Sequence, residues 1–220
     1  MTEMAGQKRL GKIAGVSGAT LLLLGTFLHP VPDNPNDAGT AFPAYAADQF
    51  WVTSHLLQWL GIWFIVAVLV LLSRRLANGP AGNWAALGMA GAIACLAVAS
   101  TLQAVDGVAL KVMVDAWAAA PDHEKATWFQ AAFAVRQIEI GLAAVSNLLT
   151  GATVCVYGIA LMIDRTKPTW CGAIGILDGI LLAAASVVMA HTGFSQLAMA
   201  LSMPGSLLLL VWIIILGFFV

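Results

Sequence analysis

The stretch VTSHLLQWLGIWFIVAVLVLLS, residues 52–73, decides the fold class of this chain. A spanning helix needs about 20 mostly apolar residues, and this stretch meets that length without one Asp, Glu, Lys or Arg. Similar stretches recur along residues 1–220, which we interpret as a single transmembrane domain. The predicted spans are 11–29, 52–73, 84–105, 138–163, 169–191 and 197–220. The predicted fold is therefore all-α, a polytopic six-helix transmembrane bundle.

The composition of the whole chain agrees with a membrane protein. Charged residues make up 10% of it, against about 25% in a soluble domain, and 60% of it is hydrophobic. The net charge of −1 comes with no clustered basic face, so we expect no nucleic-acid partner. Cys95, Cys155 and Cys171 lack the CxxC spacing of a zinc ribbon or redox pair, which predicts small buried apolar residues instead.

The distribution of basic residues predicts the orientation in the membrane, because Lys and Arg collect on the cytoplasmic side. If the spans alternate, seven of them fall on one side: Lys8, Arg9, Lys12, Arg74, Arg75, Arg165 and Lys167. We therefore expect a multi-pass protein of the inner (plasma) membrane with both termini in the cytoplasm. The first span is expected to be retained, because the small-residue site at residues 44–46 lies too far beyond Leu28 for signal-peptide cleavage.

The segments between the spans differ in character. Residues 30–49 are rich in Pro, Asn and Asp, which predicts an irregular outer loop. Residues 106–121 carry an apolar face and place Lys111 and Asp115 at i,i+4 spacing, which predicts that the third helix continues past the membrane. Pro121-Asp122 then turns the chain before a helix restarts toward the fourth span. The result is an extracytoplasmic helical hairpin.

The last span holds two further features. Pro204-Gly205 predicts a kink or a break in its helix. Paired broken helices are typical of transporters, and this break has no counterpart in the first half of the chain. The chain ends inside apolar sequence at Val220, which fits either a missing tail or a carboxylate at the inner interface.

Ionisable residues at membrane depth are costly, so they indicate function by default. The fourth span and the residues just before it carry five polar residues within an arc of about 100°, at 100° per residue. They are Arg136, Glu139, Ser146, Asn147 and Thr150. This arc is expected to face the bundle interior or a partner chain. A second copy of the same chain could be that partner, so a homo-oligomer is possible. It is either a polar pocket or pathway, or one Arg–Glu pair with small polar residues that hold helices together.

Two other spans present polar faces at the same, outer level. His55 and Gln58 share one face of the second span, and Gln103 and Asp106 share one face of the third. Each residue alone fits an interfacial or hydrogen-bonded position. Together with Asn147 they predict a polar pocket at the outer side of the bundle.

The remaining histidines add to this layer. His29 ends the first span and His191 ends the fifth, so three of the four histidines reach the outer boundary on different helices. Asp178 lies apart from them, near mid-membrane on the fifth span. It is either a proton-relay residue or part of an inter-helix hydrogen bond.

Imidazole nitrogens and carboxylate oxygens are ligands that suit zinc, iron, copper or manganese. The candidate metal ligands are His29, His55 and His191, completed by Asp106 or Glu139. The alternative cofactor is a haem with two histidines, such as His55 and His191, as axial ligands. No HExxH or HxxxH spacing is present, so the arrangement in space decides between these sites.

The same groups could perform acid–base chemistry without a cofactor, because a carboxylic acid in an apolar site can protonate an alkene or epoxide. Glu139 or Asp106 would be the acid, Arg136 would bind an anionic group and His55 would be the base. The sequence therefore predicts a membrane enzyme acting on a small lipophilic substrate. The alternative is a non-catalytic transporter, ligand-binding protein or accessory subunit of a membrane complex.

Several short motifs accompany this layout. They are Lys12-Ile13-Ala14-Gly15, Ser73-Arg74-Arg75-Leu76, Pro168-Thr169-Trp170-Cys171-Gly172, Gly175-Ile176-Leu177-Asp178-Gly179 and a tryptophan, Trp212, in the last span. In these features most of the chain resembles a widespread group of small six-helix bacterial membrane proteins, classed as a domain of unknown function. The resemblance implies the six-helix fold and a bacterial inner membrane. It implies no activity and no catalytic residues.

Overall fold

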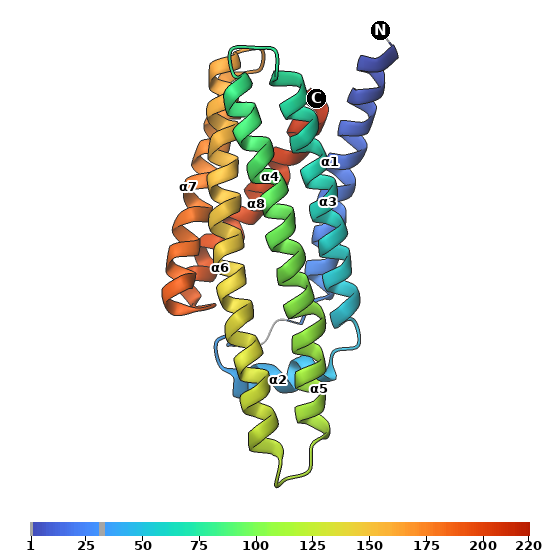
Figure 1. The fold of residues 1–220 in the computed structure, drawn as a ribbon, viewed down its shortest axis with the longest axis vertical. Coiled ribbons are helices and arrows are strands. Elements are labelled where there is room, and N and C mark those ends of the chain that lie inside the picture. Colours follow the sequence, from blue (N-terminus) through green and yellow to red (C-terminus); the bar gives the residue numbers. More distant parts are fainter. Residues whose placement is uncertain (1, 31–33) are drawn as a thin grey trace.

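The computed structural model describes residues 2–30 and 34–220, and this part of the chain is all-α, without a strand (Figure 1). Its elements are α1 (Thr2–Leu28), α2 (Ala38–Ala47), α3 (Trp51–Leu76), α4 (Gly82–Ala104), the π-helical turn η1 (Val105–Leu110), α5 (Lys111–Ala119), α6 (Lys125–Asp164), α7 (Thr169–Thr192) and α8 (Gln196–Phe219). Within the described residues, six helices are long and apolar enough to cross a membrane, which confirms the predicted all-α class and its six apolar helices.

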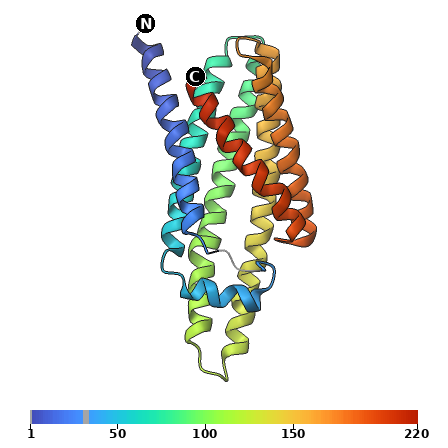
Figure 2. The same ribbon diagram turned by 180° about the vertical axis from the view of Figure 1, so that it is seen from behind.

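Two of these helices are longer than the predicted spans. The third runs from Gly82 through η1 and α5 to Ala119, and α6 covers 40 residues. The extra length forms a helical hairpin that protrudes beyond the other helices, with the turn after Ala119 at its tip (Figure 1). We call this end of the molecule the hairpin end. Both chain termini lie at the opposite end (Figures 1 and 2).

The long helices pack in a closed ring in chain order. α1 packs on α3, α3 on α4, α4 on α6, α6 on α7, α7 on α8, and α8 returns to α1. α6 and α7 approach each other closely, since a Cβ atom on Gly158 would lie 2.8 Å from the carbonyl oxygen of Gly172. Small residues at such crossings let helix backbones approach in a membrane environment. The core near the chain termini is built around Leu72, Tyr157 and Trp212.

The predicted helical hairpin is confirmed in its local contacts. The ammonium group of Lys111 lies 2.8 Å from the carboxylate of Asp115. Lys125 donates to the carbonyl oxygens of Trp117 and Ala118, so it satisfies free carbonyls at the end of α5. The hairpin is therefore held at both of its helix ends near the turn.

The prediction of an irregular loop at residues 30–49 is wrong for α2, and residues 31–33 of that loop lie outside the described part. Asp37 caps α2 by accepting a hydrogen bond from the Gly39 amide. Phe42 and Tyr45, three residues apart, are buried against α5 and α6. Figure 2 shows α2 lying across these two helices. This burial outweighs the loop-forming composition of the segment.

The last helix is not broken at Pro204, where the sequence predicts a kink or a break, because α8 continues through this residue. A proline removes one backbone donor, and packing of α8 against α7 and α1 stabilises the rest of the helix. The three cysteines are free, as expected, with Cys171 fully buried and the other two half-buried.

Candidate metal centre at the hairpin end

Three ionisable side chains from three separate segments meet near the hairpin end. His29 follows the end of α1, His55 lies in the second turn of α3, and Asp106 lies in η1. Each can offer one nitrogen or oxygen, and these three atoms all lie within 4.8 Å of one another. Small side-chain rotations bring such a set to the roughly 3–4 Å that separates the ligands of one ion.

Both imidazoles are anchored through Nδ1. That atom lies 2.8 Å from the carbonyl oxygen of Pro30 in His29 and 2.7 Å from the carbonyl oxygen of Trp51 in His55. A carbonyl oxygen only accepts, so Nδ1 carries a proton in both rings, and Nε2 is the nitrogen that remains to bind an ion in the neutral imidazole. Metal-binding histidines show this same arrangement, with the second ring nitrogen donating to a carbonyl or carboxylate.

The free nitrogen of His55 faces the carboxylate of Asp106. Nε2 and Oδ2 are 3.0 Å apart, and the His55 side chain is 3% exposed. Within the described residues, His55 Nε2 and Asp106 Oδ1 are buried without a hydrogen-bond partner. An unpaired buried polar atom costs about 1–3 kcal/mol, which an ion bound between the two groups would relieve.

The π-helical turn explains how Asp106 reaches this place. A π turn inserts a residue into the helical repeat and is frequent at functional sites. The indole of Trp51 donates to the backbone carbonyl of Asp106 at 2.9 Å, which ties η1 to α3. The next residue is Gly107, where a Cβ atom would lie 2.6 Å from the Cβ of His55. Only glycine lets the two backbones approach closely enough for the histidine and the carboxylate to meet.

An aromatic cluster encloses one side of the three residues. The ring of His29 lies 4.7 Å from Trp51 and 5.1 Å from His55, measured between centroids, and Tyr45 of α2 lies 4.4 Å from Trp51. Burial, together with the neighbouring His55, lowers the pKa of His29, which favours the neutral imidazole. Burial raises the pKa of Tyr45 to about 12, so its hydroxyl stays protonated. Neither Tyr45 nor Trp51 is among the site residues predicted from the sequence.

Arg136 and Glu139 form a buried ion pair on α6, with side chains 6% and 3% exposed. Arg136 also donates to the carbonyl oxygen of Pro35 at 2.9 Å, and its guanidinium lies over the rings of Tyr45 and Phe194. The charges of Arg136 and Glu139 therefore neutralise each other. Arg136 joins α6 to α2 and to the segment that precedes it, rather than pointing to an open pocket.

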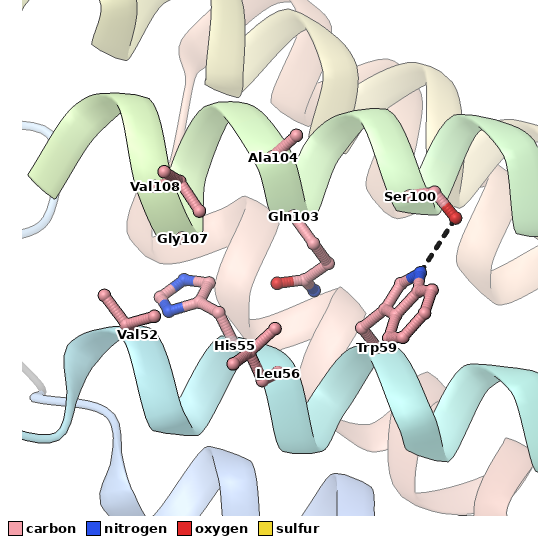
Figure 3. Close-up of a pocket in the computed structure, with 9 residues that line it drawn as sticks. All are labelled: Val52, His55, Leu56, Trp59, Ser100, Gln103, Ala104, Gly107 and Val108. Atoms are coloured by element: carbon pink, nitrogen blue, oxygen red, sulfur yellow. Dashed lines mark hydrogen bonds between the residues drawn. The ribbon is translucent and has the colours of Figure 1, made fainter.

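The predicted polar faces of the second and third spans do meet. Gln103 donates to Gln58 at 3.3 Å, and His55 contacts Asp106 one turn nearer the hairpin tip. Beside them a groove of about 230 Å³ lies between α3 and the α4–η1 helix. Figure 3 shows Gln103 extending into this groove between His55 and Trp59.

Two of the predicted site residues lie elsewhere. His191 is exposed near the end of α7, outside the set formed by His29, His55 and Asp106. The structure therefore does not bring His191 close to His55. The predictions of these two histidines as shared metal ligands, or as the two axial ligands of a haem, are not supported. Asn147 is half-buried on α6, about three helical turns from Arg136. A haem between His29 and His55 is disfavoured, because a porphyrin would have to pass between rings 5.1 Å apart.

Asp178 is separate from the site, as predicted from its depth. It is fully buried on α7 near Gly205 of α8, and neither carboxylate oxygen has a hydrogen-bond partner within the described residues. The predicted inter-helix hydrogen bond is therefore not formed by the described residues.

Comparison of the chain with protein-family models, with curated proteins and with solved structures found no match. The resemblance to the six-helix bacterial group stays a prediction. Function therefore has to be inferred from the geometry of the site.

Proposed function

We propose that this protein is a membrane-spanning metalloenzyme that acts on a small lipophilic molecule. The observation that carries the proposal is the set of His29, His55 and Asp106, with both Nδ1 atoms bonded to carbonyl oxygens. Two imidazoles and one carboxylate form the ligand set of many mononuclear iron(II) sites, and they also suit zinc and manganese. A first-row divalent metal ion is the cofactor we assign.

The number of ligands supports catalysis rather than a structural role. Structural zinc sites use four protein ligands, whereas catalytic sites use three and keep a position open for water or substrate. The separation of His55 Nε2 and Asp106 Oδ2, 3.0 Å, fits two ligands at right angles. Two atoms each about 2.1 Å from an ion and at 90° lie about 3.0 Å apart, so a facial arrangement leaves further positions open.

The surrounding residues have supporting roles in this proposal. Trp51 orients both partners, since its carbonyl oxygen accepts from His55 and its indole donates to Asp106. Arg136 and Glu139 hold α6 against the segment after His29, as positioning residues. This replaces the acid–base scheme in which Glu139 and Arg136 would contact the substrate.

We further propose the bacterial inner membrane as the location, with both termini in the cytoplasm and the hairpin end outside. In support, the seven basic residues near the ends of α1, α3 and α6 lie at the end that holds both termini (Figure 1). The lipophilic nature of the substrate follows from this location, since the site lies among apolar helices near one membrane boundary.

Cysteine labelling tests this orientation. In intact spheroplasts, a membrane-impermeant maleimide is expected to label His123→Cys, because His123 lies 80% exposed at the hairpin tip. Thr166→Cys, exposed in the α6–α7 turn, is the matched control and should react only after lysis. Labelling of Thr166→Cys in intact spheroplasts and of His123→Cys only after lysis would reverse the orientation.

Metal analysis tests the proposed cofactor. Protein purified without chelator is expected to contain about one first-row metal ion per chain. Removing the metal should lower the thermal midpoint, and adding iron(II), zinc or manganese back should restore it. At 100 times the dissociation constant, binding stabilises the fold by about 2.7 kcal/mol, or about 5–11 °C for a chain of this size. Folded, metal-free protein that responds to none of these ions would refute the proposal.

A further inference from the structure

Three basic side chains from separate parts of the chain converge at the end of the molecule that holds both termini. Lys8 lies in the second turn of α1 and Arg75 in the last turn of α3, both exposed, and Lys167 is half-buried in the α6–α7 turn. Within the described residues, none of the three forms an ion pair. We call these three residues the basic triad. It lies at the opposite end of the bundle from the metal ligands (Figure 1).

The end of α8 brings two members of the triad together. α1 meets α8 one turn after Lys8, where a Cβ atom on Gly11 would lie 2.8 Å from the carbonyl oxygen of Gly217. The ammonium group of Lys167 lies 5.2 Å from the ring centroid of Phe219, in the same turn of α8. Lys8 and Lys167 therefore border the same helix end, although 159 residues separate them in the chain.

Arg75 reaches this place from α3. The turn that follows it touches the end of α6, since a Cβ atom on Gly79 would lie 3.1 Å from Oδ1 of Asp164. Burial, together with the positive charges of Arg75 and Lys8, lowers the pKa of Lys167, and the carboxylate of Asp164 opposes this shift. Like charges at short range repel one another, and an anion bound among them would relieve that repulsion.

The start of α7 adds backbone donors beside Lys167. Among the described residues, no side chain caps this helix at Pro168, so its first amide groups lack an acceptor. The amino-terminal end of a helix carries a partial positive charge and favours phosphate groups. These amides extend the positive surface of the basic triad.

Exposed tryptophans place the basic triad at the level of lipid headgroups. Trp170 lies in the first turn of α7, three residues after Lys167, and Trp84 lies at the start of α4; they are 48% and 37% exposed. Tryptophan collects at this level of a membrane, because its ring is apolar and its N–H group is polar. The phosphate of a phospholipid, rather than phosphate free in water, is therefore the anion held next to the triad.

We propose that the basic triad binds the phosphate headgroup of an anionic phospholipid, with the free amides of α7 as further donors. Clusters of Lys and Arg at the cytoplasmic ends of spanning helices attract such headgroups. A lipid bound here would link α1, α3 and the α6–α7 turn, and it would stabilise this end of the bundle. The inference is independent of the metal centre, which lies at the hairpin end.

Native mass spectrometry of the full chain in detergent tests the assignment. The probes are phosphatidylglycerol, phosphatidylcholine with the same acyl chains, and inorganic phosphate. We expect phosphatidylglycerol to bind about tenfold to 100-fold more tightly than phosphatidylcholine. Lys167→Gln and Arg75→Gln each remove one charge and should weaken the binding of phosphatidylglycerol about fivefold. Lys167→Arg keeps the charge and should bind as wild type does.

Arg74→Gln is the matched control, because Arg74 is exposed on the same turn of α3 and points about 100° away from Arg75. It should bind phosphatidylglycerol within about twofold of wild type. Equal losses in Arg74→Gln and Arg75→Gln would show a diffuse attraction and overturn the site, and so would equal binding of the two lipids. Displacement of phosphatidylglycerol by inorganic phosphate at equal concentration would assign the site to a soluble phosphate and overturn the lipid proposal. Since Arg75 is exposed, its variant tests the site even if Lys167→Gln fails to fold.

Discussion

Replacing Arg136 with methionine is expected to destabilise the protein by about 3–5 kcal/mol, because it leaves the Glu139 carboxylate buried without its partner. The change also removes the hydrogen bond from Arg136 to the carbonyl oxygen of Pro35. At about 2–4 °C per kcal/mol, the thermal midpoint in detergent should fall by about 6–20 °C. Thermal unfolding of the purified variant measures this effect.

Two companion variants show whether the ion pair causes the loss. Arg136→Met combined with Glu139→Leu removes both charges, and we expect it to recover most of the stability, as apolar replacements of buried ion pairs do. Arg74→Met removes the same side chain at an exposed position and should change stability by less than about 0.5 kcal/mol. Equal loss in Arg136→Met and Arg74→Met would show that the buried pair does not stabilise the hairpin end.

Loss of a metal ligand is expected to have the largest effect on binding. His55→Ala and Asp106→Asn should each weaken metal affinity by more than about 100-fold, since changes to second-shell partners alone cost about 10–100-fold. Asp106→Asn keeps the shape of the side chain, so the loss of metal affinity in this variant measures the contribution of the carboxylate charge. Isothermal titration of the metal-free protein with zinc measures both affinities.

His191→Ala is the matched control for these variants. The sequence predicts His191 as a ligand together with His29 and His55, but the side chain is exposed on α7 outside the set. Zinc affinity should therefore stay within about twofold of wild type, a difference of less than 0.5 kcal/mol. A loss in His191→Ala equal to that in His55→Ala would mean that three histidines converge on the ion.

Much of the fold could be predicted because length and composition decide it. Apolar stretches without charges specify six long helices, and Lys111, Asp115 and Pro121 specify the hairpin. The helix α2 could not be predicted in this way. Its stability comes from burial of Phe42 and Tyr45 against helices that are far away in the sequence, and its composition is that of a loop.

The site was predictable only as a set of helix faces. The pairs His55 with Gln58 and Gln103 with Asp106 follow from helical spacing, and the structure joins the two pairs. Which helices pack together and how each is rotated depends on tertiary contacts, so His191 could not be separated from His29 by sequence. The π turn at Asp106 and the close approach at Gly107 likewise depend on how α3 and η1 pack.

X-ray absorption at the zinc edge tests the metal centre most directly. The spectrum of the zinc-loaded protein is expected to show nitrogen and oxygen ligands at about 2.0–2.2 Å, with the outer-shell scattering of two imidazoles. His55→Ala should reduce that scattering to one imidazole or abolish binding, and His191→Ala should leave it unchanged. A spectrum without imidazole scattering, or one that His55→Ala does not alter, would contradict a centre formed by His29, His55 and Asp106.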